Sequence, residues 1–260
     1  MTTALITGAS SGIGRALARE FAADGHNLVL VARREAALQE LADGLTRAHR
    51  VNARAIVADL TRAQAPRDIA GELSRAGLAV DVVVNNAGFG MSGALAALPP
   101  ERQLEMIQVN VTALTELTRL FLPGMLERNR GGVLNVGSTA GFQPGPFMAV
   151  YYATKAYVVA FSEALAEETA GSGLRISCLA PGPTATGFAE EAQVNESRLF
   201  KLGTMNAEVV ARIGYRGWKR GTVIVVPGFT NRVGILAVRL SPRFAVRKLL
   251  RFLNTARSRP

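Results

Sequence analysis

Two side chains near the middle of the sequence could transfer a proton. Tyr151 and Lys155 stand four residues apart, which places a phenol and an ammonium one turn apart on one helix face. A phenol has an unperturbed pKa of about 10, and a nearby cation lowers that pKa by favouring the phenolate. Tyr152 and Tyr157 have no lysine at this spacing. The pair indicates a general acid or base at Tyr151, although a plain amphipathic helix could carry the same spacing.

A glycine-rich turn follows the first apolar run of the chain, residues 4–7, and a helical apolar pattern starts at Ile13. Glycines let a backbone turn approach a pyrophosphate, and the N-terminus of the helix behind it favours the anion. The spacing is Gly-x-x-x-Gly-x-Gly, and a plain glycine turn is the alternative. The residues expected to bind a dinucleotide here are Gly8, Ser10, Ser11, Gly12, Ile13 and Gly14.

Two arginines follow the second apolar run, residues 27–31, where an enzyme that selects NAD usually has a carboxylate for the ribose 2′-hydroxyl. Arg33 and Arg34 offer guanidinium groups for a 2′-phosphate instead, and Arg15 adds positive charge beside the glycine turn. We therefore expect NADP(H) as the cofactor. The alternative is that both arginines only begin a solvated helix.

These motifs, with several others, resemble the short-chain dehydrogenase/reductase family over about residues 2–227. The segment TGASSGIG from Thr7 to Gly14 matches the cofactor loop of that family, and residues 85–88 match its Asn-Asn-Ala-Gly segment. Its catalytic tetrad is matched in order and spacing by Asn110, Ser138, Tyr151 and Lys155. The cofactor-binding residues that the resemblance adds are Asp59, Leu60, Asn86, Ala87, Gly88, Tyr151, Lys155, Pro181, Gly182, Thr184 and Thr186.

The resemblance implies hydride transfer between NADP(H) and a carbonyl or secondary alcohol. Tyr151 would exchange a proton with the substrate oxygen, and Lys155 would lower the pKa of the tyrosine and hold the ribose. Ser138 would hydrogen-bond the substrate oxygen. Asn110 would hold a helix irregularity and a water that relays protons. An NADP(H)-binding regulatory or scaffold protein without turnover is the alternative, which the fold alone does not exclude.

Apolar runs alternate with helical segments, which predicts a single-domain Rossmann fold, a doubly wound parallel sheet of seven strands with helices on both faces. We expect helices near 99–129 and 150–170, and Pro123 should kink or end the first. A catalytic domain over residues 1–227 would continue into an extension of the same domain over residues 228–260. The expected strands lie near 3–7, 27–31, 54–58, 80–84, 132–137, 175–179 and 222–226.

Bulky apolar residues follow the predicted strand ends and catalytic segments, where open α/β sheets bind ligands. They favour an apolar carbonyl substrate, with ordinary loop packing as the alternative. Residues 183–203 are the expected lid, with Gly187 and Gly203 as hinges and an acidic, solvent-facing run at 190–196. The candidate pocket residues are Phe89, Met91, Phe142, Phe147 and Met148.

Composition excludes several other classes. Cys178 is the one cysteine, so no intramolecular disulfide can form, and we expect it to fill the core. His26 and His49 have no neighbouring carboxylate pattern, so no metal site is predicted. No recognised nucleic-acid-binding module is present. No apolar run reaches about 18 residues and no signal peptide is visible, so we expect a cytoplasmic protein.

The C-terminal region carries most of the formal net charge of +10. Residues 228–260 contain eight Arg or Lys and no acid, which leaves about +2 for residues 1–227. Ser241 and Pro242 predict a helix start, with the serine as N-cap and the proline at the first helical position. Three readings of the basic, amphipathic segment 232–259 stay open: peripheral contact with the inner face of a membrane, contact within a homodimer or homotetramer, or a helix packed on its own subunit.

Overall fold

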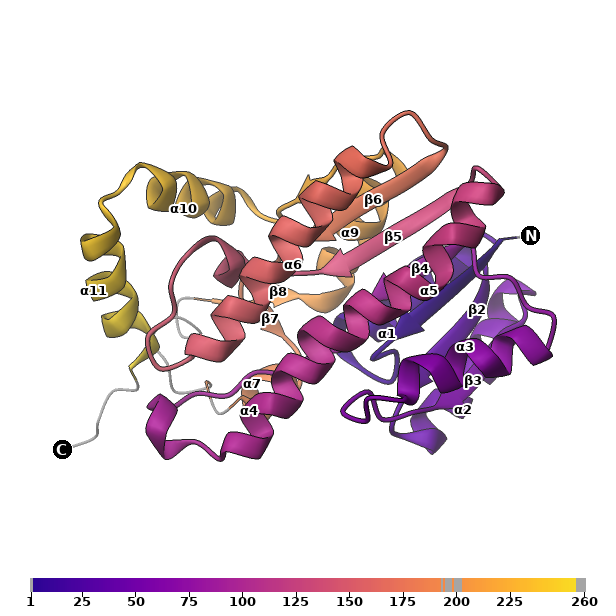
Figure 1. Cartoon of the computed structure of the whole chain (residues 1–260), viewed down its shortest axis with the longest axis horizontal. Coiled ribbons are helices and arrows are strands. Elements are labelled where there is room, and N and C mark those ends of the chain that lie inside the picture. The colour runs from indigo at the N-terminus through magenta and orange to yellow at the C-terminus, as the bar shows by residue number, and fades with distance from the viewer. Residues whose placement is uncertain (1, 193, 195–197, 199–202, 256–260) are drawn as a thin grey trace.

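A computed structural model describes residues 2–192, 194, 198 and 203–255. Within these residues, seven parallel strands form one sheet in the order β3-β2-β1-β4-β5-β6-β9. The chain moves outward from β1 to β3, then returns to place β4 beside β1 (Figure 1). The strands are β1 (Thr3–Thr7), β2 (Asn27–Ala32), β3 (Ala53–Val57), β4 (Val82–Asn85), β5 (Gly131–Val136), β6 (Leu174–Leu179) and β9 (Ile224–Val225).

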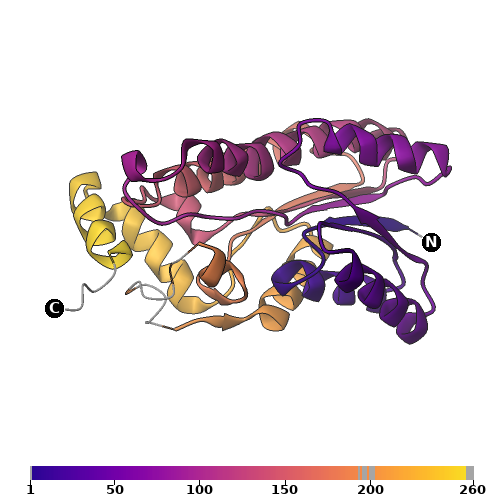
Figure 2. The same ribbon diagram turned by 90° about the horizontal axis from the view of Figure 1, so that it is seen from below.

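Helices cover both faces of the sheet (Figure 2). Since successive side chains of a strand point to opposite faces, Ala4 and Ile6 pack in one core cluster and Leu5 in the other. This burial on both faces explains why the strands read as continuous apolar runs. One face carries α1 (Gly12–Ala23), α2 (Glu35–His49) and α9 (Ala207–Lys219), and the other α3 (Ala65–Arg75), α5 (Leu114–Glu127) and α6 (Ala149–Glu168).

The predicted fold class is confirmed, and each predicted strand is present with ends that differ by at most two residues. The sequence did not predict a small second sheet, in which β7 (Thr184–Ala185) pairs with β8 (Met205–Asn206). Strands of two residues are too short to show a periodic pattern. This second sheet joins the segment after β6 to the residues immediately before α9.

The helical segment expected near 99–129 consists of α4 (Pro100–Ile107), a π-helical turn η2 (Gln108–Ala113) and α5. Pro123 lies inside α5, which continues to Glu127, so the expectation that this proline ends the helix is wrong. Pro123 and Arg119 are both exposed. Water can therefore satisfy the Arg119 carbonyl, which loses its usual N–H partner at the proline. A kink at Pro123 stays a prediction.

Two C-terminal helices, α10 (Phe229–Leu240) and α11 (Arg243–Asn254), lie at the end of the molecule opposite the N-terminus (Figure 1). The predicted cap is wrong by one residue, because Pro242 occupies the N-cap position of α11. Ser241 instead ends α10, and its hydroxyl donates to the Ala237 carbonyl at 2.7 Å, a local bond that competes with capping. Across the described residues, no helix combines the length and the apolar character needed to cross a bilayer.

Candidate active site

A cavity of about 1030 Å³ lies at the carboxyl ends of the central strands. It extends from the glycine turn after β1 to the helix pair α10–α11. The strand order reverses between β1 and β4, which separates their loops and is where open α/β sheets bind ligands. The predicted site residues that line it are Gly8, Ser10, Ser11, Gly12, Ile13, Arg33, Arg34, Asp59, Leu60, Asn86, Ala87, Gly88, Ser138, Tyr151, Lys155, Pro181, Gly182, Thr184 and Thr186.

The glycine turn after β1 needs glycine for two different reasons. Gly8 has φ +64° and Gly12 has φ +53°, in the left-handed region that side chains rarely adopt. Gly14 lies behind the turn, where a Cβ would approach within 2.3 Å of Asn86 Nδ2 and 2.4 Å of the Gly8 carbonyl. Gly14 therefore allows the turn to pack against the loop after β4, whereas Gly8 and Gly12 provide the left-handed backbone of the turn before α1.

Asn86, in the loop after β4, holds the turn in place. Its Nδ2 donates to the Thr7 carbonyl at 2.9 Å and to the Gly8 carbonyl at 3.3 Å. The Thr7 hydroxyl in turn accepts from the backbone N–H of Asn86 and of Ala87, both at 3.0 Å. The loops after β1 and β4 are thus joined by four hydrogen bonds, and the cavity between them is preformed.

The end of β2 presents positive charge to the cavity. Arg34 donates from Nε and Nη2 to the Ser10 hydroxyl at 3.3 and 3.2 Å, which places its guanidinium against the glycine turn. Arg33 Nη2 lies 3.9 Å from Glu191 Oε1, and both side chains are largely exposed. Asp59 follows β3 and accepts from the Thr61 N–H at 3.1 Å, while Leu60 is buried beside it. The acidic residue expected of an NAD-selective site is absent from residues 32–34.

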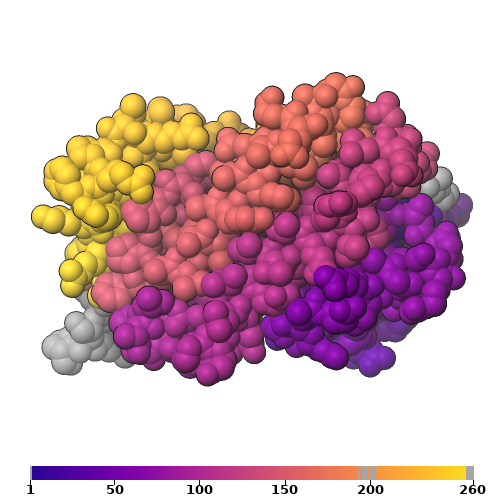
Figure 3. All heavy atoms as spheres, viewed as in Figure 1, coloured from indigo at the N-terminus to yellow at the C-terminus, as the bar shows by residue number. Residues whose placement is uncertain are grey.

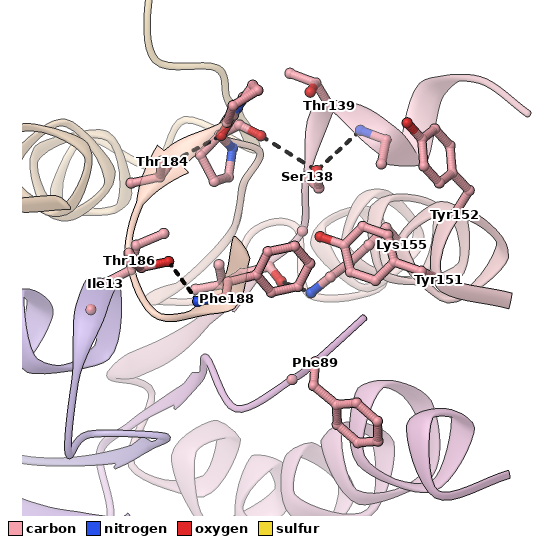
Figure 4. Close-up of a pocket in the computed structure, with 18 of the residues that line it drawn as sticks. Ile13, Phe89, Ser138, Thr139, Tyr151, Tyr152, Lys155, Thr184, Thr186 and Phe188 are labelled. Carbon is pink, nitrogen blue, oxygen red and sulfur yellow. Dashed lines mark hydrogen bonds between the residues drawn. The ribbon is translucent and has the colours of Figure 1, made fainter. Parts of the chain in front are cut away.

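The segment after β6 closes the cavity above the strands. Thr184 Oγ1 donates to the Gly182 carbonyl at 2.9 Å, and Thr186 Oγ1 accepts from the Phe188 N–H at 3.3 Å (Figure 4). A Cβ on Gly182 would lie 2.5 Å from Oδ1 of Asn231, which belongs to α10. Gly182 therefore allows the C-terminal helices to approach this turn closely.

Asn110 is buried in the π-helical turn η2, at the helix irregularity that the resemblance implied. Its Oδ1 accepts from the Phe89 N–H at 3.1 Å, and its Nδ2 donates to the Phe89 carbonyl at 3.0 Å and to Thr154 Oγ1 at 3.1 Å. These bonds join the loop after β4 to α6. Unlike its three partners, Asn110 does not line the cavity among the residues described, and its amide acts by positioning that loop.

Ser138, Tyr151 and Lys155 come together at one part of the cavity, between β5 and α6 (Figure 4). Ser138 Oγ accepts from the Ala140 N–H at 3.1 Å and donates to the Pro181 carbonyl at 3.5 Å. Lys155 Nζ donates to the Val136 carbonyl at 2.8 Å and lies 5.8 Å from the centroid of the Tyr151 ring. The phenol and the ammonium thus share a helix face, as their spacing predicted.

The expected effect of Lys155 on the pKa of Tyr151 is not found. Burial raises the pKa of the Tyr151 phenol well above its usual range, and the Ser138 hydroxyl opposes this shift only in part. Burial also lowers the pKa of the Lys155 ammonium to about 8. Because both groups are excluded from water, desolvation penalises the charged form of each. At neutral pH the phenol therefore keeps its proton.

The C-terminal helices form a wall of the cavity that the sequence analysis did not assign. Tyr152 of α6 donates its hydroxyl to Asn254 Oδ1 at 3.2 Å, and Asn254 Nδ2 donates to the Pro146 carbonyl at 2.9 Å. The helical spacing of the apolar residues in α11 was a signal that could have identified this wall. Its apolar residues include Ile235, Val238, Val246, Leu249, Leu250 and Leu253.

Only two of the five candidate pocket residues line the cavity, Phe89 and Met148. Met91, Phe142 and Phe147 lie outside its lining among the residues described. Phe188, which was not predicted, lines the cavity, and its ring centroid is 5.2 Å from that of Tyr151 (Figure 4). Phe188 lies on the short helix α7 (Phe188–Glu191), in the segment between β7 and β8. That segment has no periodic pattern of apolar residues.

The expected lid is described only in part. Glu190 and Glu191 are exposed, as predicted, whereas Ala189 and Ala192 pack in the core. Residues 193, 195–197 and 199–202, which hold most of the acidic run, lie outside the described residues. Movement about Gly187 and Gly203 stays a prediction.

The cysteine and the first histidine, both among the described residues, lie outside the cavity lining. Cys178 is fully buried in β6, and burial raises the pKa of its thiol to about 11, so it is an unreactive core residue. His26 forms a hydrogen bond with the Thr2 hydroxyl at 2.9 Å, and neither residue lines the cavity. Within the described part of the chain, no three His, Cys, Asp or Glu residues gather as a metal site would require.

A doubly wound sheet with a glycine turn at its switch point and a Ser, Tyr and Lys cluster nearby defines a class of nucleotide-dependent oxidoreductases. The sequence profile of the family described as short chain dehydrogenase matches residues 2–197. The very-long-chain 3-oxoacyl-CoA reductase of Anas platyrhynchos is 33% identical over 231 residues, 84% of this chain and 70% of that protein. The rat form is 35% identical over 197 residues, which is 61% of its length, so the chain spans less than two thirds of that relative.

Solved structures match along nearly the whole chain. A short-chain dehydrogenase from Sphingobium yanoikuyae in complex with NADPH has a TM-score of 0.82 at 31% identity, covering 100% of this chain and 99% of that one. A short-chain dehydrogenase/reductase from Burkholderia phymatum in complex with NAD has a TM-score of 0.80 at 29% identity, covering 99% and 98%. The chain belongs to the short-chain dehydrogenase/reductase family and is an oxidoreductase.

Proposed function

We propose that the protein is an NADP(H)-dependent carbonyl reductase whose substrate is an apolar ketone or aldehyde. The proposal rests on the residues that line one cavity. The glycine turn and two arginines lie at one part of it, and Ser138, Tyr151 and Lys155 at another. A single ligand crevice thus holds a site for a nucleotide and a set of proton-transfer groups.

The residues present fit a phosphorylated dinucleotide. Backbone N–H groups at Gly8 and Gly12 and the N-terminus of α1 suit the pyrophosphate, and Asp59 and Leu60 lie where the adenine would bind. Arg33 and Arg34 suit a 2′-phosphate better than a free hydroxyl, because planar guanidinium groups bind phosphate in a fork. The two structural relatives hold different cofactors, so the preference for NADP(H) rests on these arginines.

When bound, the reduced nicotinamide supplies the hydride. Tyr151, whose phenol is kept protonated at neutral pH by burial, donates that proton to the carbonyl oxygen. Ser138 donates a hydrogen bond to the same oxygen and stabilises the negative charge that develops there. Lys155, anchored on the Val136 carbonyl, places a cation beside the phenolate that proton transfer leaves behind. Asn110 positions the loop after β4 that borders these groups.

The cavity wall favours an apolar substrate. Phe89, Met148 and Phe188 lie near the proton-transfer groups, and the inner sides of α10 and α11 add aliphatic residues. A pocket of this kind binds a ligand mainly through apolar contact, with a few polar groups to orient it. The long acyl substrate in the name of the duck relative agrees with this choice.

We also propose that residues 228–255 are an integral wall of the catalytic domain and that the protein is a homodimer or homotetramer. The outer sides of α4, α5 and α6 expose several apolar residues that an interface would cover. They are Leu104, Ile107, Leu120, Leu126 and Tyr157.

The test is consumption of NADPH, and separately of NADH, across ketones, aldehydes, quinones, steroids and acyl-chain carbonyls. We expect turnover of bulky apolar carbonyls with NADPH. Tyr151→Phe should lower turnover by about 10²–10⁴-fold with nucleotide binding kept. Tyr157→Phe is the matched control, since its hydroxyl bonds to Thr115 at the exposed outer side of α6. Near-normal turnover by the Tyr151 variant would refute the proton donor, and a strong NADH preference would refute the role of the arginines.

A further inference from the structure

The outer side of the α10–α11 pair carries a continuous apolar stripe. Phe229, Val233, Leu236 and Leu240 follow one another at spacings of four, three and four residues, which places them on one face of α10. Their side chains are 47–79% exposed, and the stripe is not part of the cavity lining. Phe244 and Phe252 of α11 are also exposed, at 59% and 57%. A row of exposed large apolar side chains marks a surface that contacts something else.

The exposed surface of the pair is also strongly basic. Six exposed cations lie on the two helices, and neither helix contains an acidic residue. In residues 2–192, 194, 198 and 203–255, no carboxylate forms a salt bridge with any of them. Arg232 donates to the Val226 carbonyl at 2.9 Å, and Arg239 and Arg251 lie 5.9 and 6.0 Å from the rings of Phe142 and Phe147. The six are Arg232, Arg239, Arg243, Arg247, Lys248 and Arg251.

The inner side of each helix faces the cavity, so the pair separates the cavity from this outer surface. Ile235 and Val238 of α10 and Val246 and Leu250 of α11 line the cavity. Leu249 both lines the cavity and is 57% exposed, which places an apolar side chain at the cavity mouth. The pair forms a separate lobe at one end of the molecule (Figure 3). A ligand entering beside this lobe would pass from an apolar, basic surface into an apolar pocket.

We propose that the outer side of α10–α11 docks on the surface of an anionic lipid bilayer and that apolar substrate enters the cavity from that surface. The docking itself follows from the surface, while the route of entry rests on the proposed function. Apolar residues flanked by arginine and lysine match the interface of a bilayer with anionic headgroups. A second copy of this chain fits poorly, because a two-fold contact would place these cations against each other.

The test is flotation of the full chain with two kinds of vesicle, phosphatidylcholine alone and phosphatidylcholine with phosphatidylserine. We expect binding to the anionic vesicles and little to the neutral ones. Arg243→Glu/Lys248→Glu should weaken binding by about 30-fold or more, since each cation near such a surface contributes about 1 kcal/mol. Leu236→Ser/Leu240→Ser should weaken it as well. None of these four residues lines the cavity, so reduction of a water-soluble ketone should be unchanged.

The matched control is Arg47→Glu/Arg216→Glu, which changes the net charge equally at exposed positions on α2 and α9. Equal loss of binding in this control would show that net charge, not the surface, is responsible, and would overturn the proposal. So would absence of binding by the wild type, or dissociation of an oligomer by the α10 variant in sedimentation experiments. Vesicle binding by a protein that reduces no carbonyl would refute the proposed function and leave the docking surface in place.

Discussion

Tyr152 donates its hydroxyl to Asn254 Oδ1 at 3.2 Å, which joins the helix that carries the proton-transfer groups to the last helix described. The two residues are 102 positions apart, and both are buried. Asn254 Nδ2 also donates a hydrogen bond to the Pro146 carbonyl. The cavity wall formed by α11 is thus attached to α6 and to the loop before it at one amide.

Replacing Asn254 with leucine should loosen that wall. Two hydrogen bonds, one buried and one partly buried, are lost and their partners are left unsatisfied, so we expect about 1–3 kcal/mol less stability and a Tm lower by several degrees. The KM for a bulky carbonyl should rise more than kcat falls. Thermal unfolding and steady-state kinetics measure both. Thr255→Ala, at the exposed neighbouring residue, should behave like wild type; similar losses in the two variants would contradict the role of the amide.

Gly14 should tolerate no side chain. In Gly14→Ala the new methyl would meet Asn86 Nδ2 at 2.3 Å and the Gly8 carbonyl at 2.4 Å, so we expect a loss of about 1–3 kcal/mol and weaker nucleotide binding. Gly44→Ala is the matched control, because nothing lies within 4 Å of the methyl it adds to α2. That change should stabilise the protein by about 0.5–1 kcal/mol. Chemical denaturation and calorimetric nucleotide titration report the two effects, and normal binding by Gly14→Ala would refute the close packing.

The stability of the nucleotide-free protein should rise from about pH 8 to pH 10.5, because Lys155 loses its buried charge over this range. Its pKa falls from 10.5 to about 8 on folding, so the unfolded chain binds more protons between these values and stability rises with pH across them. Below pH 8 the folded state bears the full desolvation of the ammonium. We therefore expect Lys155→Met to be inactive yet more stable by about 1–3 kcal/mol at neutral pH.

Urea unfolding of the wild type and this variant at pH 7 to 10.5 measures the difference. Lys248→Met is the control, because its side chain is exposed on α11 and should leave the pH dependence unchanged. Parallel curves for the wild type and Lys155→Met would show that the ammonium is not desolvated in the folded protein.

Glu191 should weaken the binding of NADPH. Its carboxylate lies 3.9 Å from the Arg33 guanidinium, where it would compete with a 2′-phosphate for that cation and repel the phosphate. Since exposed ion pairs contribute about 0.2–1 kcal/mol, Glu191→Gln should bind NADPH about 1.4- to fivefold more tightly. NADH, which has no 2′-phosphate, is the matched control ligand in a fluorescence titration. An equal gain with NADH, or weaker binding of NADPH, would place the phosphate elsewhere.

Local patterns predicted most of the fold and of the candidate nucleotide site. Apolar runs identified the strands because each is buried on both faces, and a turn such as Gly8 to Gly14 needs glycine for reasons contained within a few residues. The segment between β6 and α9, which contains Phe188 and the small sheet β7–β8, has no such pattern in its sequence. Met91, Phe142 and Phe147 were placed in the pocket from their neighbours along the chain, but the direction of a loop side chain depends on what packs beside it.

The sequence alone determined which residues stand on one helix face, so Tyr151 and Lys155 were paired correctly from their spacing. Only the tertiary structure decided how their protons are held, because a pKa responds to exclusion of water by segments far away in the chain. The same holds for the C-terminal helices. Their basic, amphipathic character can be read from the sequence of residues 229–254, whereas the position of α11 over the cavity rests on tertiary contacts such as the hydrogen bond between Tyr152 and Asn254.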